Sequence, residues 1–254
     1  MKELIVMIYM KLTKNMTEGN IYRSFLVFAG PLILSLMLSQ AYSTIDAVIA
    51  GKFISENALG AISATGSYEL LLHSLFSGFA AGFGIYTAQQ FGKGDYGALK
   101  RDVVSMGIFI CAVAGMISLL SILLRDPIFS YLKVDPILRP DAEVYFVIFT
   151  MGYFLSYLNL LLAQVLYAMG ISSVSLMVSF IAAVVKIGGN LLTVLVLDGG
   201  VAGLACFTVL SSLATTVCYL LILKKAFREL KSENTPFRFQ FTCVKNSLKY
   251  TLPA

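Results

Sequence analysis

Apolar residues fill six long stretches of the chain, and short segments rich in Gly, Pro, Asp or basic residues separate them. A helix needs roughly 20 apolar residues to cross a hydrocarbon core about 30 Å thick, and each stretch reaches that length. The pattern therefore predicts an all-α membrane protein with six transmembrane helices. The expected spans are residues 24–50, 57–91, 98–124, 140–169, 172–197 and 200–225.

The composition agrees with a membrane protein. Of the 254 residues, 58% are hydrophobic and 13% are charged, whereas soluble domains are about 45–50% apolar and about 25% charged. The four cysteines form no CxxC pair or Cys/His cluster, so no metal or other cofactor is expected. No nucleic-acid-binding signature accompanies the net charge of +5, so nucleic acid is not an expected partner.

The basic residues indicate an orientation, because cytoplasmic loops carry an excess of Lys and Arg. If the N-terminus is cytoplasmic, only Lys52, Arg125, Lys133 and Arg139 fall in outer segments. Most other Lys and Arg residues then fall in inner segments, and both termini are cytoplasmic. We therefore expect a multi-pass protein of the plasma or inner membrane, surrounded by lipids.

Asp46 is the strongest candidate for a functional residue, because it lies inside the first apolar stretch. A charge at the centre of a membrane helix costs about 2.5–3.5 kcal/mol on insertion scales and suggests function by default. We expect Asp46 in the outer part of its helix, on one face with Ser39 and Ser43. The alternative is a hydrated, idle Asp near the end of the helix.

Lys186 lies near the midpoint of the fifth span, too deep for its ammonium group to reach water easily. It therefore needs a partner or a water-filled cavity. Asn190 follows one helical turn later and Thr193 two turns later, which gives a polar stripe. We hypothesise that Lys186 and Asp46 are electrostatically coupled, so that a cation bound at Asp46 competes with Lys186. A fixed structural ion pair is the alternative.

The second span carries Glu69, His73 and Ser77 at intervals of four residues, on one face of a helix. The functional interpretation is a proton relay or a wall that attracts cations. The alternative is a self-satisfied Glu–His pair between helices.

Tyr157 and Asn159 are polar residues inside the apolar fourth span. Aromatic rings in this span could stack on a flat cationic substrate. The alternative is interhelical hydrogen bonding.

Several segments resemble, in the same order, the multidrug and toxic compound extrusion (MATE) transporters. They are Pro31, "IDAVIAGKFISENALGAISATG", "SGFAAGFGIYTAQQFGKGDYGALKR", "LYAMGISS" and "GGVAGLACFTVLSS". The resemblance covers about residues 20–225. It implies one six-helix lobe of a twelve-helix, two-lobed transporter. It also implies export of small organic cations and amphipathic compounds, driven by H⁺ or Na⁺ as the coupling ion.

The resemblance also assigns residues to the coupling-ion site. The family's first-helix aspartate falls on Asp46. Asn190 is similar to an asparagine of the fifth helix, and Thr208 to a sixth-helix hydroxyl of the same site. One subgroup has an Asp where this chain has Val194, so the two-carboxylate site of that subgroup is incomplete here.

Three regions are expected along the chain: a cytoplasmic arm at 1–22, the six-helix lobe at 23–225, and at 226–254 a linker that begins a second lobe. A second six-helix lobe, missing here, is therefore an expected partner. A flippase for lipid-linked oligosaccharides and a non-transporting membrane scaffold are the alternatives. An enzyme is not expected, because no Ser/Lys, HExxH or paired-Asp constellation is evident.

Overall fold

The computed structural model describes residues 21–230, 239 and 241–251, which are helical apart from short connections. The elements in chain order are α2 (Ile21–Ile49), η1 (Ala50–Ile54), α3 (Glu56–Lys93), α4 (Tyr96–Leu123), α5 (Arg125–Tyr131), α6 (Arg139–Met151), α7 (Tyr153–Ala168), α8 (Ser173–Leu192), η2 (Thr193–Leu197), α9 (Gly200–Glu229) and α10 (Phe241–Thr251). The two η segments are short π-helical turns that extend α2 and α8.

The expected six spans are confirmed, with one break. Among the described residues, five helices are long and apolar enough to cross a membrane, and a sixth span results if α6 and α7 count as one. These two helices are bent by 46° at their junction, where Gly152 lies. A Cβ atom on Gly152 would lie 2.6 Å from Val209 on α9. A glycine at this junction therefore allows the bent segment to pack closely against α9.

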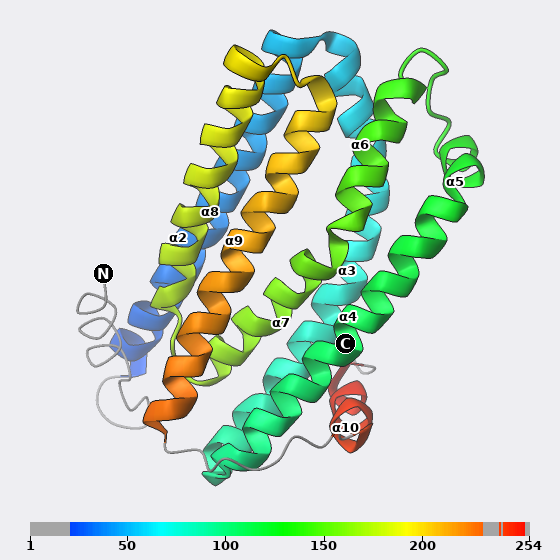
Figure 1. Ribbon diagram of the computed structural model, residues 1–254. Helices are drawn as coiled ribbons and strands as arrows, with labels where there is room; N and C mark the ends of the chain where they lie inside the picture. The colour runs from blue at the N-terminus through cyan, green and yellow to red at the C-terminus, as the bar shows by residue number, and fades with distance from the viewer. Residues whose placement is uncertain (1–20, 231–238, 240, 252–254) are drawn as a thin grey trace.

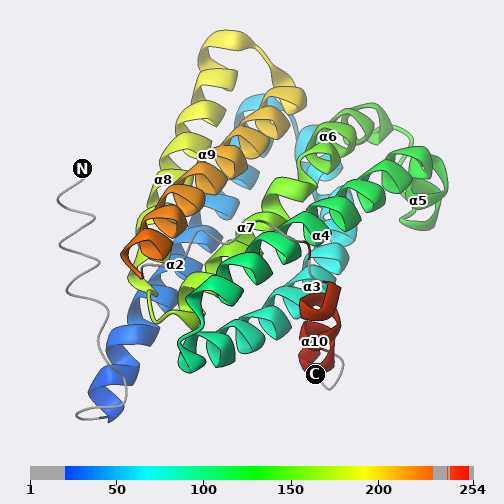
Figure 2. The ribbon, with the colours of Figure 1, turned by 60° about the horizontal axis from the view of Figure 1, so that its bottom comes forward.

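The helices pack into one bundle in which neighbours in space are often distant in sequence. α2 packs against α8, α8 against α9, and α3 against both α6 and α7. α7 contacts both α4 and α9 and lies between them (Figure 1). Figure 2, turned so that the lower end of the bundle comes forward, also shows α7 between α4 and α9.

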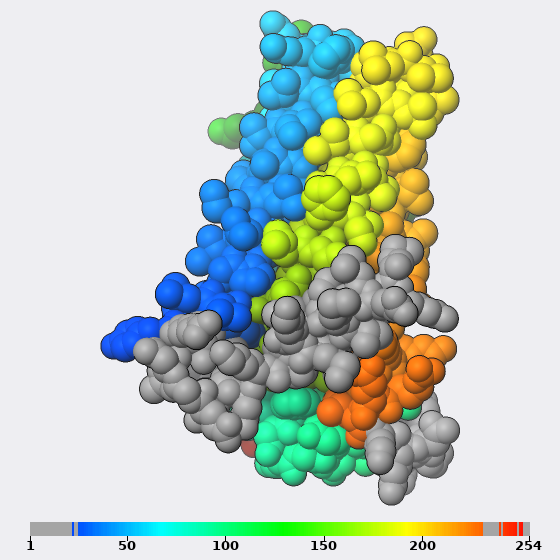
Figure 3. Space-filling model, turned by 90° about the vertical axis from the view of Figure 1, so that its left-hand side faces the viewer, coloured from blue at the N-terminus to red at the C-terminus, as the bar shows by residue number. Residues whose placement is uncertain are grey.

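Side by side, α2 and α8 form one face of the molecule (Figure 3). Because α2 packs mainly on α8, it leaves a broad apolar surface exposed, including Phe25, Ile33, Leu34 and Met37. A surface of this kind is suited to contact with lipid or with another membrane-spanning domain.

The turns follow their local chemistry. Ser55 caps α3 by accepting a hydrogen bond from the Ala58 amide at 3.0 Å, and Asp95 caps α4 by accepting one from the Ala98 amide at 2.9 Å. Gly94 ends α3 with a φ of 78°, which an L side chain rarely adopts. The expected end of the first span at residue 50 is wrong, because η1 continues the helix to Ile54.

The last described helix, α10, packs against α3 and α4 (Figure 1). Its buried face carries Cys243, Val244 and Ser247, which are spaced to share one side of a helix. α9 runs to Glu229, beyond the expected end of the lobe at residue 225. Most of the expected arm at 1–22 and part of the expected tail region lie outside the described residues.

Candidate ion-coupling site

Asp46 on α2 is bound by two side chains from α8. The ammonium group of Lys186 lies 2.5 Å from Asp46 Oδ2, and the amide of Asn190 donates a hydrogen bond to Asp46 Oδ1 at 2.6 Å. The Asp46 and Lys186 side chains are 19% and 15% exposed. The carboxylate is therefore held by a charge-assisted pair of contacts in a largely buried position.

Helical spacing explains why these groups meet. Lys186 and Asn190 are four residues apart on α8, so both project toward the same strip of α2. Tyr42, four residues before Asp46, lies on the same side, and its ring centroid is 5.2 Å from the Lys186 ammonium. The ammonium is thus held by a carboxylate and by an aromatic face. Sequence reasoning missed Tyr42, although its four-residue distance from Asp46 was a usable signal.

The pair lies within the membrane-spanning segments and away from their ends. The first span continues past Asp46 to Ile54, about two helical turns further. Lys186 lies near the middle of the span Ser173–Leu197. The alternative of an idle, hydrated Asp near a helix end does not describe this geometry, because Asp46 is paired and mostly shielded.

Glu69 on α3 contributes a second acidic group. It is half-buried and lies within electrostatic range of Lys186. No hydrogen bond or ion pair joins Glu69 to another residue of the described part of the chain. When all are ionised, Asp46, Glu69 and Lys186 together carry one negative charge.

His73 does not pair with Glu69 in this structure. Its side chain is exposed, and among residues 21–230 no ion pair or hydrogen bond connects the two. Residues four apart on a helix differ by about 40° in direction. Here that rotation separates a residue facing the interior from one on the outer surface, where Leu70 and Leu71 are also exposed.

Tyr157 is packed into the core. Its ring stacks on Phe76 at a centroid distance of 3.8 Å and an interplanar angle of 8°, and the residue is 3% exposed. One ring face is therefore covered and unavailable to a ligand. The buried hydroxyl has no hydrogen-bond partner among the described residues.

Asn159 and Thr208 are both satisfied by hydrogen bonds away from Asp46. Asn159 donates to the Ser212 carbonyl at 2.9 Å and accepts from the Thr216 hydroxyl at 2.8 Å, so it joins α7 to α9. Thr208 donates to the Leu204 carbonyl of its own helix at 2.9 Å, as Ser and Thr often do within helices. The interhelical alternative therefore describes Asn159, and the structure does not bring Thr208 to Asp46.

Two buried oxygens of the predicted polar stripe remain without partners. Asn190 Oδ1 on α8 and Thr193 Oγ1 in η2 have no hydrogen-bond partner among the described residues. Asn190 lies beside Asp46, whereas Thr193 faces Gly203 on α9. Hard cations are bound by carboxylate, carbonyl and hydroxyl oxygens, and carboxylates also bind protons. The arrangement is thus chemically able to take a proton or a small hard cation. In the described ranges no group of three His, Cys, Asp or Glu residues could hold a metal ion.

Comparison with known proteins gives consistent results. The family model MatE matches residues 31–192. The probable multidrug resistance protein YpnP of Bacillus subtilis is 26% identical over 197 residues, which cover 77% of this chain and 44% of that protein. The chain therefore spans about half the length of this relative.

Solved structures share the fold. A MOP superfamily transporter from Pyrococcus furiosus superposes with a TM-score of 0.80 at 18% identity, covering 92% of this chain and 52% of the other. The MATE transporter VcmN from Vibrio cholerae, in its bent form, gives 0.77 at 15% identity, covering 91% and 54%. The described helices thus correspond to one lobe of a transporter of this type.

Proposed function

The chain belongs to the MatE family, and from this premise we propose that it forms the first lobe of a cation-coupled antiporter. The transporter would export small cationic or amphipathic organic compounds and would use H⁺ or Na⁺ as the coupling ion. Asp46 would take the coupling ion, with Asn190 beside it. The contact of Asp46 with Lys186 and Asn190 inside the membrane is the observation that carries the proposal.

The charge balance of the site supports cation coupling. The Lys186 ammonium is the one positive charge beside the carboxylates of Asp46 and Glu69. The three groups therefore carry one net negative charge, which a single H⁺ or Na⁺ can neutralise. Binding at Asp46 weakens its attraction for Lys186, which can then turn toward Glu69. The ammonium group would remain paired in both states, which avoids the large cost of an isolated charge at membrane depth.

This exchange can be linked to a change in shape. The Asp46–Lys186 contact joins α2 to α8, and α2 has few other contacts in the bundle. An ion that breaks the contact would alter the packing of α2 and shift the balance between two conformations of the lobe. Alternating access in secondary transporters uses such shifts between repeated units.

The remaining parts of the proposal concern location and partner. The Lys and Arg bias favours a cell-membrane protein with a cytoplasmic N-terminus. The chain matches about half the length of its relatives, so a second six-helix lobe would complete the pathway. The exposed apolar face of α2 offers a surface for lipid or for that lobe.

The test is transport by the chain together with a second-lobe polypeptide in proteoliposomes. Efflux of ethidium would be measured under an imposed H⁺ or Na⁺ gradient. We expect Asp46→Asn to remove the gradient-dependent efflux and Lys186→Met to change its ion dependence. Glu143→Gln, in an ion pair outside the site, serves as the matched control and should transport normally.

Normal gradient-driven efflux by Asp46→Asn would refute the assignment of the coupling site. If the unmodified protein showed no gradient-dependent efflux of any cationic dye while both lobes were folded and associated, the export function would be refuted and a scaffold role favoured.

A further inference from the structure

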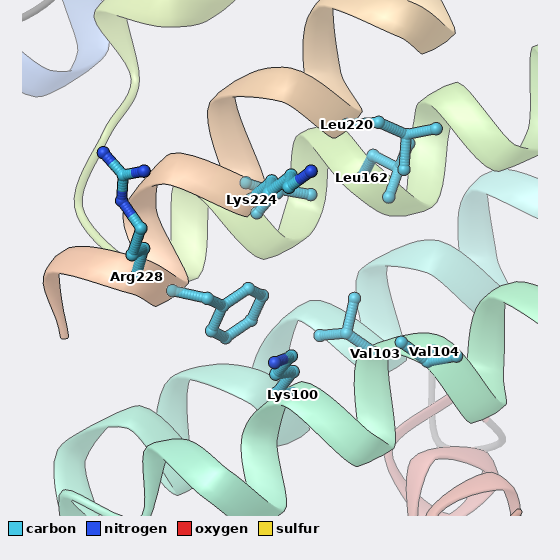
Figure 4. Close-up of a pocket in the computed structure, with 9 residues that line it drawn as sticks. Lys100, Val103, Val104, Leu162, Leu220, Lys224 and Arg228 are labelled. Atoms are coloured by element: carbon cyan, nitrogen blue, oxygen red, sulfur yellow. The ribbon is translucent and has the colours of Figure 1, made fainter. Parts of the chain in front are cut away.

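A pocket of about 580 Å³ opens between α4, α7 and α9 (Figure 4). It lies where α4 begins and α9 ends, and none of its lining residues contacts Asp46. α7 packs against both neighbours and contributes buried Leu162 to the lining. Its size is within the range of small-molecule sites, about 300–1,000 Å³.

Three cationic side chains surround this pocket. Lys100 comes from α4, and Lys224 and Arg228 come from α9 (Figure 4). None of the three forms an ion pair with another described residue, and no acidic residue lines the pocket. Cations gathered around a low-dielectric surface create a positive potential, so the pocket is suited to an anion.

The rest of the lining is apolar and reaches the outer surface of the bundle. Leu223 and Phe227 are buried within it. Val104 on α4 and Leu220 on α9 are 42% and 48% exposed at its edge. Exposed apolar residues continue along α4 to Ile108, about one turn further into the span. An anion with an apolar tail would satisfy both parts of the site, whereas a free inorganic anion would use only the cations.

We propose that this pocket binds an anionic phospholipid, with its phosphate between the three cations and an acyl chain along the apolar edge. Basic pockets between transmembrane helices on the cytoplasmic side recognise such head groups. The pocket lies at the end of the bundle that the charge bias assigns to the cytoplasm, so the lipid would come from the inner leaflet. This proposal does not depend on transport, since a lobe that transports nothing would still bind the lipid.

The absence of tryptophan from the sequence allows a direct test with the full chain. Val104→Trp places one fluorophore at the edge of the pocket, and brominated lipids quench a tryptophan that they touch. Quenching would be measured in vesicles of phosphatidylcholine and phosphatidylglycerol, with bromine on one lipid at a time. One basic residue near the membrane surface strengthens binding of an anionic lipid by roughly fivefold. We expect the fluorophore to prefer phosphatidylglycerol by at least about tenfold.

A second fluorophore position controls for general lipid contact. Phe25→Trp lies on the exposed face of α2, with 64% exposure, outside the pocket. We expect it to be quenched almost equally by both brominated lipids.

Charge variants then identify the source of the preference. In the Val104→Trp background, Lys100→Gln, Lys224→Gln and Arg228→Gln together should reduce the preference for phosphatidylglycerol at least about tenfold. Each cation would also be removed singly, so that the result does not depend on the folding of the triple variant. High salt should weaken the preference in the parent protein.

The matched control removes the same charge elsewhere at this end of the bundle. Lys93, Lys245 and Lys249 are exposed and do not line the pocket. Changing all three to Gln should leave the preference intact.

Three results would overturn the proposal. The first is equal quenching of the fluorophore at position 104 by the two brominated lipids. The second is a loss of phosphatidylglycerol preference in the control triple variant as large as that in the pocket triple variant. The third is complete relief of quenching by brominated phosphatidylglycerol when inorganic phosphate is added. The last result would indicate a site for a free anion in place of a lipid.

Discussion

Removal of Lys186 should destabilise the lobe, because it leaves the Asp46 carboxylate shielded and without its counter-charge. Both side chains are less than one-fifth exposed, so the contact behaves as a buried pair. Loss of one partner from a buried ion pair costs about 3–5 kcal/mol. Asn190 still donates to the carboxylate, so we expect Lys186→Met to lower the free energy of unfolding by about 3 kcal/mol.

The double variant measures the interaction energy between Asp46 and Lys186 apart from the contacts that each makes with other residues. Asp46→Asn alone should cost about 1–3 kcal/mol, because it removes the counter-charge of the ammonium although the amide oxygen can still accept a hydrogen bond. In Asp46→Asn/Lys186→Met neither charge remains, so the combined cost should be smaller than the sum of the single costs. Residues in direct contact show coupling energies of about 0.5–3 kcal/mol, and we expect a value near the upper end.

The assay is reversible unfolding of the full chain in mixed micelles, with helix content followed by circular dichroism. The matched control is the cycle through Arg139 and Glu143, an ion pair whose side chains are 41% and 30% exposed and whose coupling should be small. If the Asp46 and Lys186 effects added within about 0.5 kcal/mol, as distant sites do, the two residues would not be energetically coupled. The charge argument for the ion site would then fail.

Two further outcomes are expected. Gly189→Ala should lower the free energy of unfolding by about 1–3 kcal/mol, because the new Cβ would lie 2.0 Å from the Phe207 ring. The control is Gly188→Ala, whose new Cβ would meet nothing within 4 Å. In the same unfolding assay this control should be neutral or stabilising. Burial and the Asp102 carboxylate raise the pKa of the Cys243 thiol to about 12, so in a variant with this single cysteine, maleimide labelling should be slow at neutral pH and keep rising with pH toward that value. Rapid labelling of folded protein at neutral pH would show that α10 does not pack as described, and denatured protein provides the reference rate.

The spans were predictable because hydrophobic length is a local property of the chain. The break between α6 and α7 was not, since Gly152 lies within one continuous apolar stretch and its close contact is with Val209, far along the sequence. The continuation of the first helix through Gly51 was also missed. Gly51 and Lys52 suggest a turn by composition, but here they extend a helix as a π-helical segment.

The candidate site shows a sharper limit of sequence reasoning. Asn159 and Asn190 look alike in the sequence, since each is a polar residue within an apolar helix. Asn159 meets a backbone carbonyl and a hydroxyl of α9, which satisfies it and fixes helix packing. Asn190 meets the Asp46 carboxylate and keeps a buried oxygen without a partner. The difference depends on which helix lies opposite, and that follows from three-dimensional packing. A polar residue at membrane depth can form a buried contact, as these two do, or face outward, as His73 does. Where it is buried, only its partner distinguishes a structural hydrogen bond from an ion site.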